Sequence, residues 1–521
     1  MTNNSPDFQY DSCISRGICS INPRTYALQA VLVLYLRFIT KYALNLLQQG
    51  IVDKKAEELI LDTITITVSN PEFTENSFAS AITMFKEELP IIIKKYNDVC
   101  EKEDFANDKI GDVELFRETK TITDSIKYGE QEINKNLEKL SIEVRDLQKI
   151  MLIIAKSISI NLMDLESFDK NYEKGYVTVL KLINKIGEDS DVETLKNEIK
   201  EASVINNEIM HLVRLAQEER YGKQQEAEVS FTTYPSKAVL VVGSNIRELE
   251  TVLEALKDTD IDVYTHDDMM LAHNFPKFDE YKHLKGQFGQ GIENCLLDFA
   301  TFPGPIILTK HSLHNIENLF RGLLFTTDIT CPKGVIKIEN NDFTRVIEAA
   351  ENARGFKRGR QCETVKIGCN FDETVKKIIE KIEKTNYKQI FLIGLEKDSL
   401  EQKAYFDKLI KFAPEDVLII SFSNGIEKEN SISINTCYDS YNMLRFYDNL
   451  KNFDLPITAF FPKCDRNTIS QMIYLSQNEK TKVLVGKCTP IILNPSLMNV
   501  LQEMFKINGI TSAKKDLEII L

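Results

Sequence analysis

Residues 264–273 read YTHDDMMLAH and place two histidines and two aspartates within one short stretch. Imidazole and carboxylate groups bind metal ions and transfer protons near neutral pH, so the stretch could form a metal site or a working site. Five of the six histidines of the chain lie between His266 and His314, which strengthens this interpretation. A loop histidine is nevertheless more often solvated or structural than a ligand, so an ordinary loop stays open as an alternative.

The stretch follows a short apolar run, and polar residues end similar runs throughout the second half of the chain. The runs are KAVLVVGSN, DIDVYTHDD, GPIILTKHS, GVIKIE, KQIFLIGLEK, DVLIISFSNG, PITAFFPKCD and TKVLVGKCTP. They alternate with helical patterns such as residues 247–256 and 373–382, which predicts buried strands of parallel sheets in two doubly wound, Rossmann-like domains. Ligands of such sheets sit beyond the carboxyl ends of the strands, so the residues that end the runs are the candidates for a site.

The first half of the chain has a different pattern. Apolar residues recur at helical spacing through four segments, residues 28–47, 79–96, 133–165 and 192–215. We therefore expect an α/β fold class with an N-terminal all-α domain. A helical bundle at residues 1–230 would precede α/β domains at residues 231–370 and 371–521, and the length of 521 residues is enough for several cores.

Composition limits the partners that the chain is expected to have. A net charge of −14 argues against nucleic acid, because phosphate binding requires a basic surface. Apolar stretches such as residues 27–36 are too short to span a bilayer, and the polar start MTNNSPDFQYDS lacks the features of a signal peptide. We therefore expect no membrane partner and a cytoplasmic location. Ten cysteines without framework spacing favour free thiols or metal ligands over disulfides.

Several segments resemble the hybrid-cluster protein family, also called prismane or hydroxylamine reductase proteins. These segments are YTHDDMMLAH, GQFGQGIENCLLDFATFPGPIILTKHS, FTTDIT, VIEAA, CISRGICSINPRTYALQ and VGKCTPIILNPSLMNVL. Nickel carbon monoxide dehydrogenases are similar at a greater distance. The resemblance implies one helical and two α/β domains, an oxidoreductase activity, and a mixed iron, sulfur and oxygen cluster where the domains meet.

The resemblance also implies a ligand set of one histidine, two glutamates and four cysteines for that cluster. The histidine is present as His266, and one of the four cysteines is present as Cys437. Since thiolates are the ligands that hold iron and sulfide, a site with one cysteine in place of four is not expected to hold the cluster in its usual form.

The other ligand positions carry different residues in this chain. Ser312, Glu396 and Asn424 stand at the three further cysteine positions, and Asp298 and Asp465 stand at the two glutamate positions. One imidazole and three carboxylates, with Cys437 beside them, could suit a hard metal ion such as iron, manganese or zinc. Polar residues end the strands of any α/β protein, so a pocket without metal stays open as the alternative.

Cys13 and Cys19 resemble half of a second site of the family. The resemblance implies a 4Fe-4S cluster near the start of the chain, but the early Cys-x-x-Cys pair of that site is absent here. Two chains around a two-fold axis would together supply four thiolates, so we expect a homodimer bridged by a 4Fe-4S cluster through Cys13 and Cys19. Two unligated cysteines on a loop are the alternative.

Three functions from different classes are compatible with these observations. The first is a redox or sensory iron–sulfur protein of an anaerobe that lacks hydroxylamine reductase activity and exchanges electrons with a protein partner. The second is a metalloenzyme whose remodelled histidine and carboxylate site acts on a small nitrogen or oxygen substrate. The third is a structural or partner-binding scaffold without a cofactor. We favour the first, and the loss of three cluster cysteines leaves open whether the chain is an enzyme.

Overall fold

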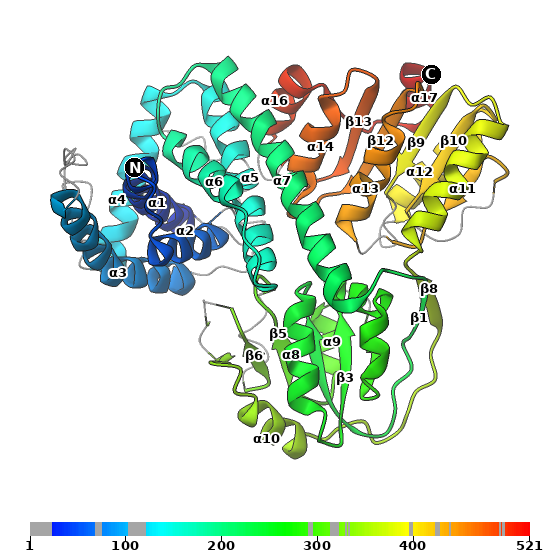
Figure 1. Cartoon of the computed structure of the whole chain (residues 1–521), viewed down its shortest axis with the longest axis horizontal. Coiled ribbons are helices and arrows are strands. Elements are labelled where there is room, and N and C mark those ends of the chain that lie inside the picture. The colour runs from blue at the N-terminus through cyan, green and yellow to red at the C-terminus, as the bar shows by residue number, and fades with distance from the viewer. Residues whose placement is uncertain are drawn as a thin grey trace, which may run out of the picture.

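The computed structural model shows three parts, a helical region and two α/β regions, arranged around the long helix α7 (Figure 1). It describes residues 23–67, 75–102, 121–289, 295–312, 322–328, 331, 334–394, 400–422, 428–436, 439–488, 491 and 495–521. The expected fold class, a helical bundle followed by two parallel-sheet domains, is confirmed. The domain boundaries expected at residues 230 and 370 stay predictions.

Seven described helices form the first part. They are α1 (Pro23–Gln48), α2 (Lys54–Ile66), α3 (Glu75–Lys102), α4 (Ile122–Lys139), α5 (Ile142–Glu166), α6 (Glu173–Lys185) and α7 (Val192–Tyr221). Side chains that accept hydrogen bonds from the first backbone N–H groups begin several of them, for example Ser141 before α5 and Asp191 before α7. The cap at Ser141 explains why the single apolar pattern of residues 133–165 belongs to two helices.

Helix α1 differs from the other helices in its apolar character. Among the described helices it alone has the length and composition of a membrane span, and 61% of its apolar window is buried inside the protein. Leu28, Val31, Leu32 and Leu36 are fully buried against the rest of the bundle. Burial of this kind is typical of a core helix.

The first parallel sheet has the strand order β4-β3-β2-β5-β6-β7. Its strands are β2 (Lys237–Val242), β3 (Ile261–His266), β4 (Leu284–Gln287), β5 (Ile306–Leu308), β6 (Leu324–Thr326) and β7 (Ile336–Lys337). Helices α8 (Ile246–Leu256), α9 (Cys295–Thr301) and α10 (Thr344–Asn352) accompany it. Every residue of β2 after Lys237 is buried, as expected for a central strand covered on both faces.

The second parallel sheet repeats this plan with the order β11-β10-β9-β12-β13-β14. Its strands are β9 (Gln389–Ile393), β10 (Val417–Ser421), β11 (Ser431–Ser433), β12 (Ile457–Lys463), β13 (Thr481–Lys487) and β14 (Ile507–Gly509). Its helices are α11 (Phe371–Lys384), α12 (Leu400–Phe412), α13 (Ser440–Leu450), α14 (Thr468–Ser476), α16 (Ser496–Phe505) and α17 (Ala513–Ile520).

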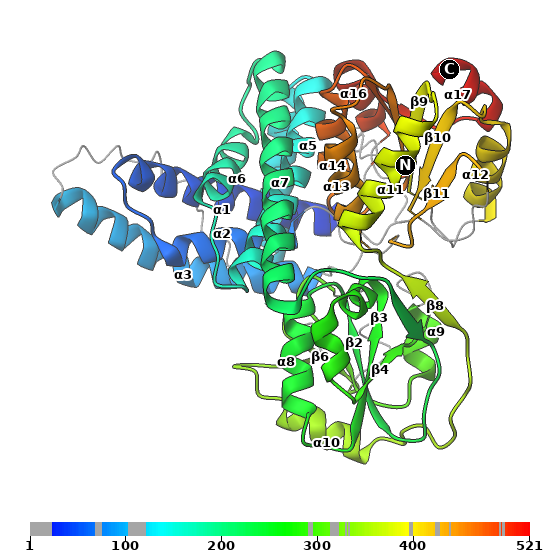
Figure 2. The ribbon, with the colours of Figure 1, turned by 45° about the vertical axis from the view of Figure 1, so that its right-hand side comes forward.

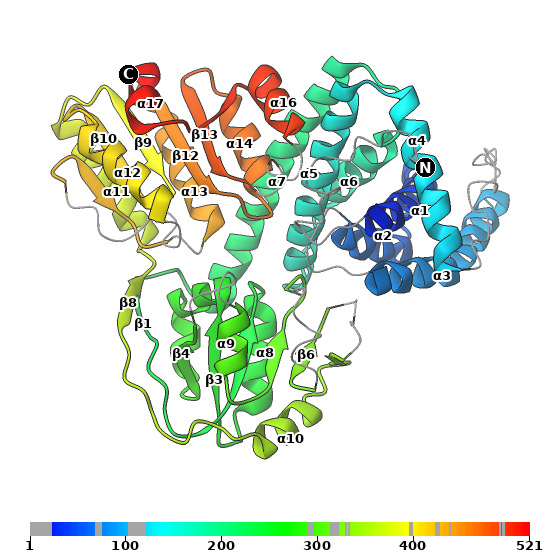
Figure 3. The ribbon, with the colours of Figure 1, turned by 180° about the vertical axis from the view of Figure 1, so that it is seen from behind.

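The three parts are joined in different ways. One apolar cluster runs without a break from the helical part into the second sheet, where α14 packs beside α5 and α7 (Figure 2). The first sheet has separate apolar clusters of its own, one of which includes Tyr221 at the end of α7. The antiparallel ribbon of β1 (Ala227–Ser230) and β8 (Thr364–Ile367) connects the two α/β parts (Figure 3). The first sheet is therefore held mainly by α7, the ribbon and polar contacts.

Candidate functional site

Each parallel sheet has one place where its strand order reverses, between β2 and β5 in the first sheet and between β9 and β12 in the second. Ligands of doubly wound sheets bind beyond the carboxyl ends of the strands at such a place. Gly243 and Thr309 follow β2 and β5 there, and Gly394 and Cys464 follow β9 and β12. A candidate site is therefore sought around these residues.

The stretch that opens with Tyr264 forms the end of β3 and a following 3-10 helix, Asp267–Asn274. His266 is the last residue of β3, and its side chain is completely buried. His273 lies on the 3-10 helix with its Nε2 3.0 Å from the hydroxyl of Thr265, and burial lowers the pKa of His273 to about 4. The two histidines therefore have separate partners.

His266 is paired with Asp298, which α9 presents to it. Nε2 of His266 lies 3.0 Å from Oδ2 of Asp298. Because an ionised carboxylate only accepts hydrogen bonds, Nε2 is the nitrogen that donates to Asp298, and in the neutral form of the ring Nδ1 is the nitrogen with a lone pair. Nδ1 is buried and has no hydrogen-bond partner among the residues that the structure describes. A ring held in this way by a carboxylate is the usual arrangement of a metal-binding histidine.

Asp298 is held in place by a close backbone approach. Gly289 has a φ of +79°, and a Cβ added to it would lie 2.2 Å from Oδ2 of Asp298. Only glycine fits such a position without moving the carboxylate. The absence of a side chain at residue 289 thus makes room for the pair of His266 and Asp298.

Ser312 lies near the place where the strand order of the first sheet reverses, between β2 and β5. Its hydroxyl is hydrogen-bonded to other residues of its own turn. Its Oγ lies 3.1 Å from Oγ1 of Thr309 and 3.4 Å from the carbonyl oxygen of Lys310. It also packs against Gly243, where an added Cβ would lie 2.0 Å from the same oxygen. A neutral hydroxyl in these contacts is a poor substitute for a thiolate ligand.

Asp465 is another predicted site residue that the structure describes. Its Oδ1 accepts hydrogen bonds from the backbone N–H of Asn467 at 2.7 Å and from the hydroxyl of Thr468 at 2.9 Å. The residue is exposed, and its carboxylate orders the turn that leads into α14. This local role does not require a metal ion.

Of the predicted set, the structure brings His266 and Asp298 together. In the described part of the chain, no group of three or more His, Cys, Asp or Glu residues is arranged to hold a metal ion. Several predicted residues lie outside the described residues: Cys13, Cys19, Glu396, Asn424 and Cys437. Their part in a site stays a prediction.

The structure also shows a polar junction that the sequence did not indicate. Asp164 of α5 accepts a hydrogen bond from Asn245 Nδ2 at 3.3 Å and pairs with Arg466 Nη2 at 3.1 Å. Asn245 begins α8 of the first α/β part, and Arg466 precedes α14 of the second. Burial raises the pKa of Asp164, against the opposing effect of Arg466. One carboxylate of the helical part thus contacts the carboxyl edges of both sheets.

Further charged groups fix the turn after β5 near this junction. Glu248 of α8 accepts hydrogen bonds from the backbone N–H of Lys310 at 3.0 Å and from the hydroxyl of Thr327 at 2.6 Å. Asp328 accepts one from the backbone N–H of His311 at 2.7 Å, where His311 has a φ of +63°. Burial raises the pKa of Glu248 and lowers that of His311 to about 3.

The cysteines correct one expectation from the sequence. Cys464 and Cys488 form a disulfide, whereas Cys100, Cys331, Cys362 and Cys369 are free thiols. The expectation of free thiols or metal ligands is wrong for this one pair. The two residues directly follow the neighbouring strands β12 and β13, and a sequence separation of 24 residues gives no sign of that proximity.

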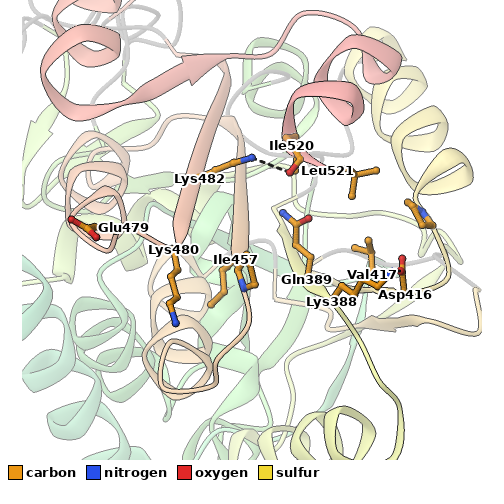
Figure 4. A pocket seen from close by; sticks show the side chains of 12 residues that line it. Lys388, Gln389, Asp416, Val417, Ile457, Glu479, Lys480, Lys482, Ile520 and Leu521 are labelled. Atoms are coloured by element: carbon orange, nitrogen blue, oxygen red, sulfur yellow. Dashed lines mark hydrogen bonds and ion pairs between the residues drawn. The ribbon is translucent and has the colours of Figure 1, made fainter.

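A cavity of about 590 Å³ lies at the opposite edge of the second sheet (Figure 4). It is lined at the amino ends of the strands by charges of both signs. Lys388 pairs with Asp416, and Lys482 donates to the carbonyl oxygens of Ile519 and Ile520. These lysines are already partnered, and the cavity is on the edge where doubly wound sheets do not bind their ligands. It is therefore not the candidate site.

The fold and the site together define a three-part α/β protein with a buried histidine and carboxylate pair at the carboxyl edge of its first sheet. Residues 9–425 match the model of the Prismane/CO dehydrogenase family. This match covers more than half of the chain, so the chain belongs to that family. The expected resemblance is confirmed.

Individual relatives are similar over nearly the whole chain. The hydroxylamine reductase of Acidiphilium cryptum is 25% identical over 527 residues, which cover 96% of this chain and 94% of the relative. That of Thermodesulfovibrio yellowstonii is also 25% identical and covers 98% of each chain. Among solved structures, carbon monoxide dehydrogenase IV from Carboxydothermus hydrogenoformans matches with a TM-score of 0.47 and 12% identity, covering 96% of this chain and 87% of its own. Family membership suggests an iron–sulfur metalloprotein.

Proposed function

We propose that this chain is a divergent hybrid-cluster-like protein that acts as a redox or sensory iron–sulfur protein and does not reduce hydroxylamine. The observation that supports this proposal is the bonding of His266, Asp298 and Ser312, which stand at ligand positions of the family's mixed cluster and are called the central site below. His266 and Asp298 are bonded to each other, and Ser312 replaces a cysteine with a hydroxyl that contacts Thr309. These residues offer no thiolate to iron or sulfide.

The donors of the central site do not fit the mixed iron, sulfur and oxygen cluster that the family resemblance implies. Such clusters rely on soft thiolate ligands, and three of the four cysteine positions carry Ser312, Glu396 and Asn424. We therefore assign no reaction step to that cluster in this chain.

The proposed cofactor is a 4Fe-4S cluster that bridges a homodimer through Cys13 and Cys19. Both cysteines lie outside the described residues, and the proposal depends on the number of thiolates that the cluster requires. Two thiolates from each chain complete the four that such a cluster takes. A cluster on a two-fold axis near the surface would exchange single electrons with an electron-transfer protein, and its exposure to oxygen fits a cytoplasmic protein of an anaerobe.

A metalloenzyme is the second candidate, and the free Nδ1 of His266 favours it. The atom is buried, lacks a partner in the described part of the chain, and belongs to a ring oriented by Asp298. In this arrangement His266 would bind one iron, manganese or zinc ion through Nδ1, while Asp298 holds the ring and does not ligate directly. Glu396, Cys437 or Asp465 would supply further ligands for a small nitrogen or oxygen substrate site.

Metal and sulfide measurements on protein purified without oxygen test these functions. We expect about two irons and two sulfides per chain, half of a shared cluster, and their loss with the dimer in a Cys13→Ala/Cys19→Ala variant. A Cys331→Ala variant, which removes an exposed free thiol, is the matched control and should keep both. Hydroxylamine reduction by the unmodified protein would contradict the proposal.

Two other outcomes of these measurements separate the alternatives. Iron that persists in the double cysteine variant and is lost in His266→Gln would favour the metalloenzyme. Protein without metal, sulfide or colour would favour a structural or partner-binding scaffold.

A further inference from the structure

The disulfide of Cys464 and Cys488 lies at the carboxyl edge of the second sheet, beside the place where the strand order reverses. In the parallel ladder of β12 and β13, Lys463 is the partner of Lys487, and the two cysteines come next. Their Cα atoms are 4.7 Å apart. Since doubly wound sheets bind their ligands and perform their chemistry at this position, the disulfide occupies a functional place in the fold.

The two cysteine residues differ in their exposure to solvent. Cys488 is 1% exposed, whereas Cys464 is partly exposed at the end of β12. A thiolate attacks a disulfide at one sulfur and displaces the other. The exposure therefore favours attack at Cys464, with Cys488 as the sulfur that leaves.

Beside the apolar packing of α14 and α16 on α5, the chain after Cys464 makes polar contacts between the second sheet and helix α5. Arg466 pairs with Asp164 at 3.1 Å, and its backbone carbonyl accepts a hydrogen bond from the hydroxyl of Ser157. Asn467 Oδ1 accepts one from Asn161 Nδ2 at 3.0 Å. Residues 157, 161 and 164 lie on one face of α5, because helical neighbours recur every three or four residues. We call residues 464–467 the docking turn, because their polar contacts join the second sheet to α5.

The disulfide links the docking turn to strand β13 at a position beyond the last hydrogen-bonded pair of the ladder. The hydrogen-bonded ladder of β12 and β13 ends at Lys463, and the bond to Cys488 joins the next residue covalently to the neighbouring strand. The backbone of the docking turn is therefore fixed on one side by the disulfide and on the other by α14. Breaking the bond removes the first of these restraints.

We propose that Cys464 and Cys488 form a redox-active pair whose state controls how the docking turn holds α5. A thiolate of an external dithiol attacks Sγ of Cys464, the bond to Cys488 breaks, and Cys488 leaves as a thiolate that takes a proton. The second thiol of the external dithiol then displaces Cys464. The pair gains two electrons and two protons, and the dithiol becomes a disulfide. This inference does not depend on a bound cluster.

Thiol counting and amide hydrogen exchange on the full chain test the proposal, with dithiothreitol as the reductant. We expect the native oxidised protein to gain two reactive thiols with dithiothreitol and to lose them again with oxidised glutathione. Reduction should make amide exchange in residues 464–468 about tenfold faster. A Cys464→Ser/Cys488→Ser variant should exchange at the faster rate in both conditions, and a Cys362→Ser control should respond like the unmodified protein.

Two results would overturn the proposal. A pair that dithiothreitol reduces only after the protein is unfolded would be a permanent cross-link. A pair that is reduced in the native protein without any change in exchange at residues 464–468 would have no influence on the docking turn. Since both measurements are made on the unmodified chain, they do not depend on whether the serine variant folds.

Discussion

Nε2 of His266 lies 3.0 Å from Oδ2 of Asp298, and this bond leaves Nδ1 of the same buried ring without a partner in the described part of the chain. The relationship changes the role expected for Asp298 from the sequence. As a family-type ligand its carboxylate would face a metal ion, whereas here it faces the imidazole. A carboxylate in that position fixes the tautomer of a histidine and increases its basicity.

The Asp298→Ala variant tests the strength of this pair. Removal of the carboxylate leaves the Nε2–H of His266 buried without its acceptor, which costs about 1–3 kcal/mol of unfolding free energy. Urea unfolding measures this loss. The Asp298→Asn variant keeps an oxygen acceptor and should recover part of the stability. Equal stability of Asp298→Ala and the unmodified protein would show that the pair is not formed in solution.

Gly289→Ala should disturb the same pair through the backbone. Gly289 and Gly50 both have positive φ, at +79° and +72°, but only at Gly289 would a Cβ meet a side chain, that of Asp298. We expect Gly289→Ala to lose about 1–2 kcal/mol more than the control Gly50→Ala, because it adds displacement of a buried carboxylate to the left-handed strain that both share.

A double variant checks the cause of the Gly289→Ala effect. In an Asp298→Ala background the added methyl group no longer meets a carboxylate, so the excess over the Gly50 control should disappear. Urea unfolding of the unmodified protein, Gly289→Ala, Asp298→Ala and the double variant measures this coupling, and Gly50→Ala is measured beside them as the control. An excess that persists without Asp298 would place the strain elsewhere in the loop.

The sequence predicts eight strands of the two parallel sheets and misses four, three of which (β4, β11 and β14) lie at sheet edges. All eight apolar runs form strands, because a short run of buried apolar residues has few other places in an α/β protein. The strands β4, β6, β11 and β14 were not expected, since segments such as LKGQ and SIS carry no apolar run. These strands form because they make backbone hydrogen bonds to a neighbouring strand. The local sequence does not predict which strand will be that neighbour.

The candidate site is predicted in part for a similar reason. His266 and Asp298 were assigned together through the family motifs, and the structure places them in contact. Asp465 was expected beside them, but its carboxylate accepts a hydrogen bond from the backbone N–H of Asn467 in its own turn. The junction of Asp164 with Arg466 was not foreseen, because the two residues are 302 positions apart and neither belongs to a motif.

Arg214 and Asp439 form a buried ion pair whose loss should be severe. The Nη2 and Oδ2 atoms lie 2.6 Å apart, and the side chains are 4% and 3% exposed. Arg214 belongs to α7 and Asp439 caps α13, so the pair joins the helical part to the second sheet. We expect Asp439→Asn and Arg214→Met each to cost about 3–5 kcal/mol, because each leaves a buried polar or charged group with too few partners.

The double variant Arg214→Met/Asp439→Asn should cost less than the sum of the two single changes, because it leaves no uncompensated charge. Chemical unfolding of the three variants measures the coupling. Arg24→Met is the control, since Arg24 belongs to an exposed ion pair with Glu75 and should lose little stability. Additive losses at Arg214 and Asp439 would mean that the two charges do not depend on each other.

Asp62 of α2 should give the protein a distinctive pH dependence. Burial raises the pKa of Asp62 from 3.8 to about 6, with Lys310 opposing the shift and Asp328 adding to it. Between these two values the folded protein keeps a proton that the unfolded chain has released, so the free energy of unfolding falls as the pH rises through this window. The Asp62→Asn variant has no group at this position that ionises, so its free energy of unfolding avoids that fall.

The stability of Asp62→Asn relative to the unmodified protein should therefore increase from about pH 4 to about pH 6 and stay higher at neutral pH. Urea unfolding across this range measures the difference, and Asp189→Asn, a change at an exposed aspartate, is the control. Parallel curves for Asp62→Asn and the unmodified protein would show that Asp62 ionises alike in the folded and unfolded states.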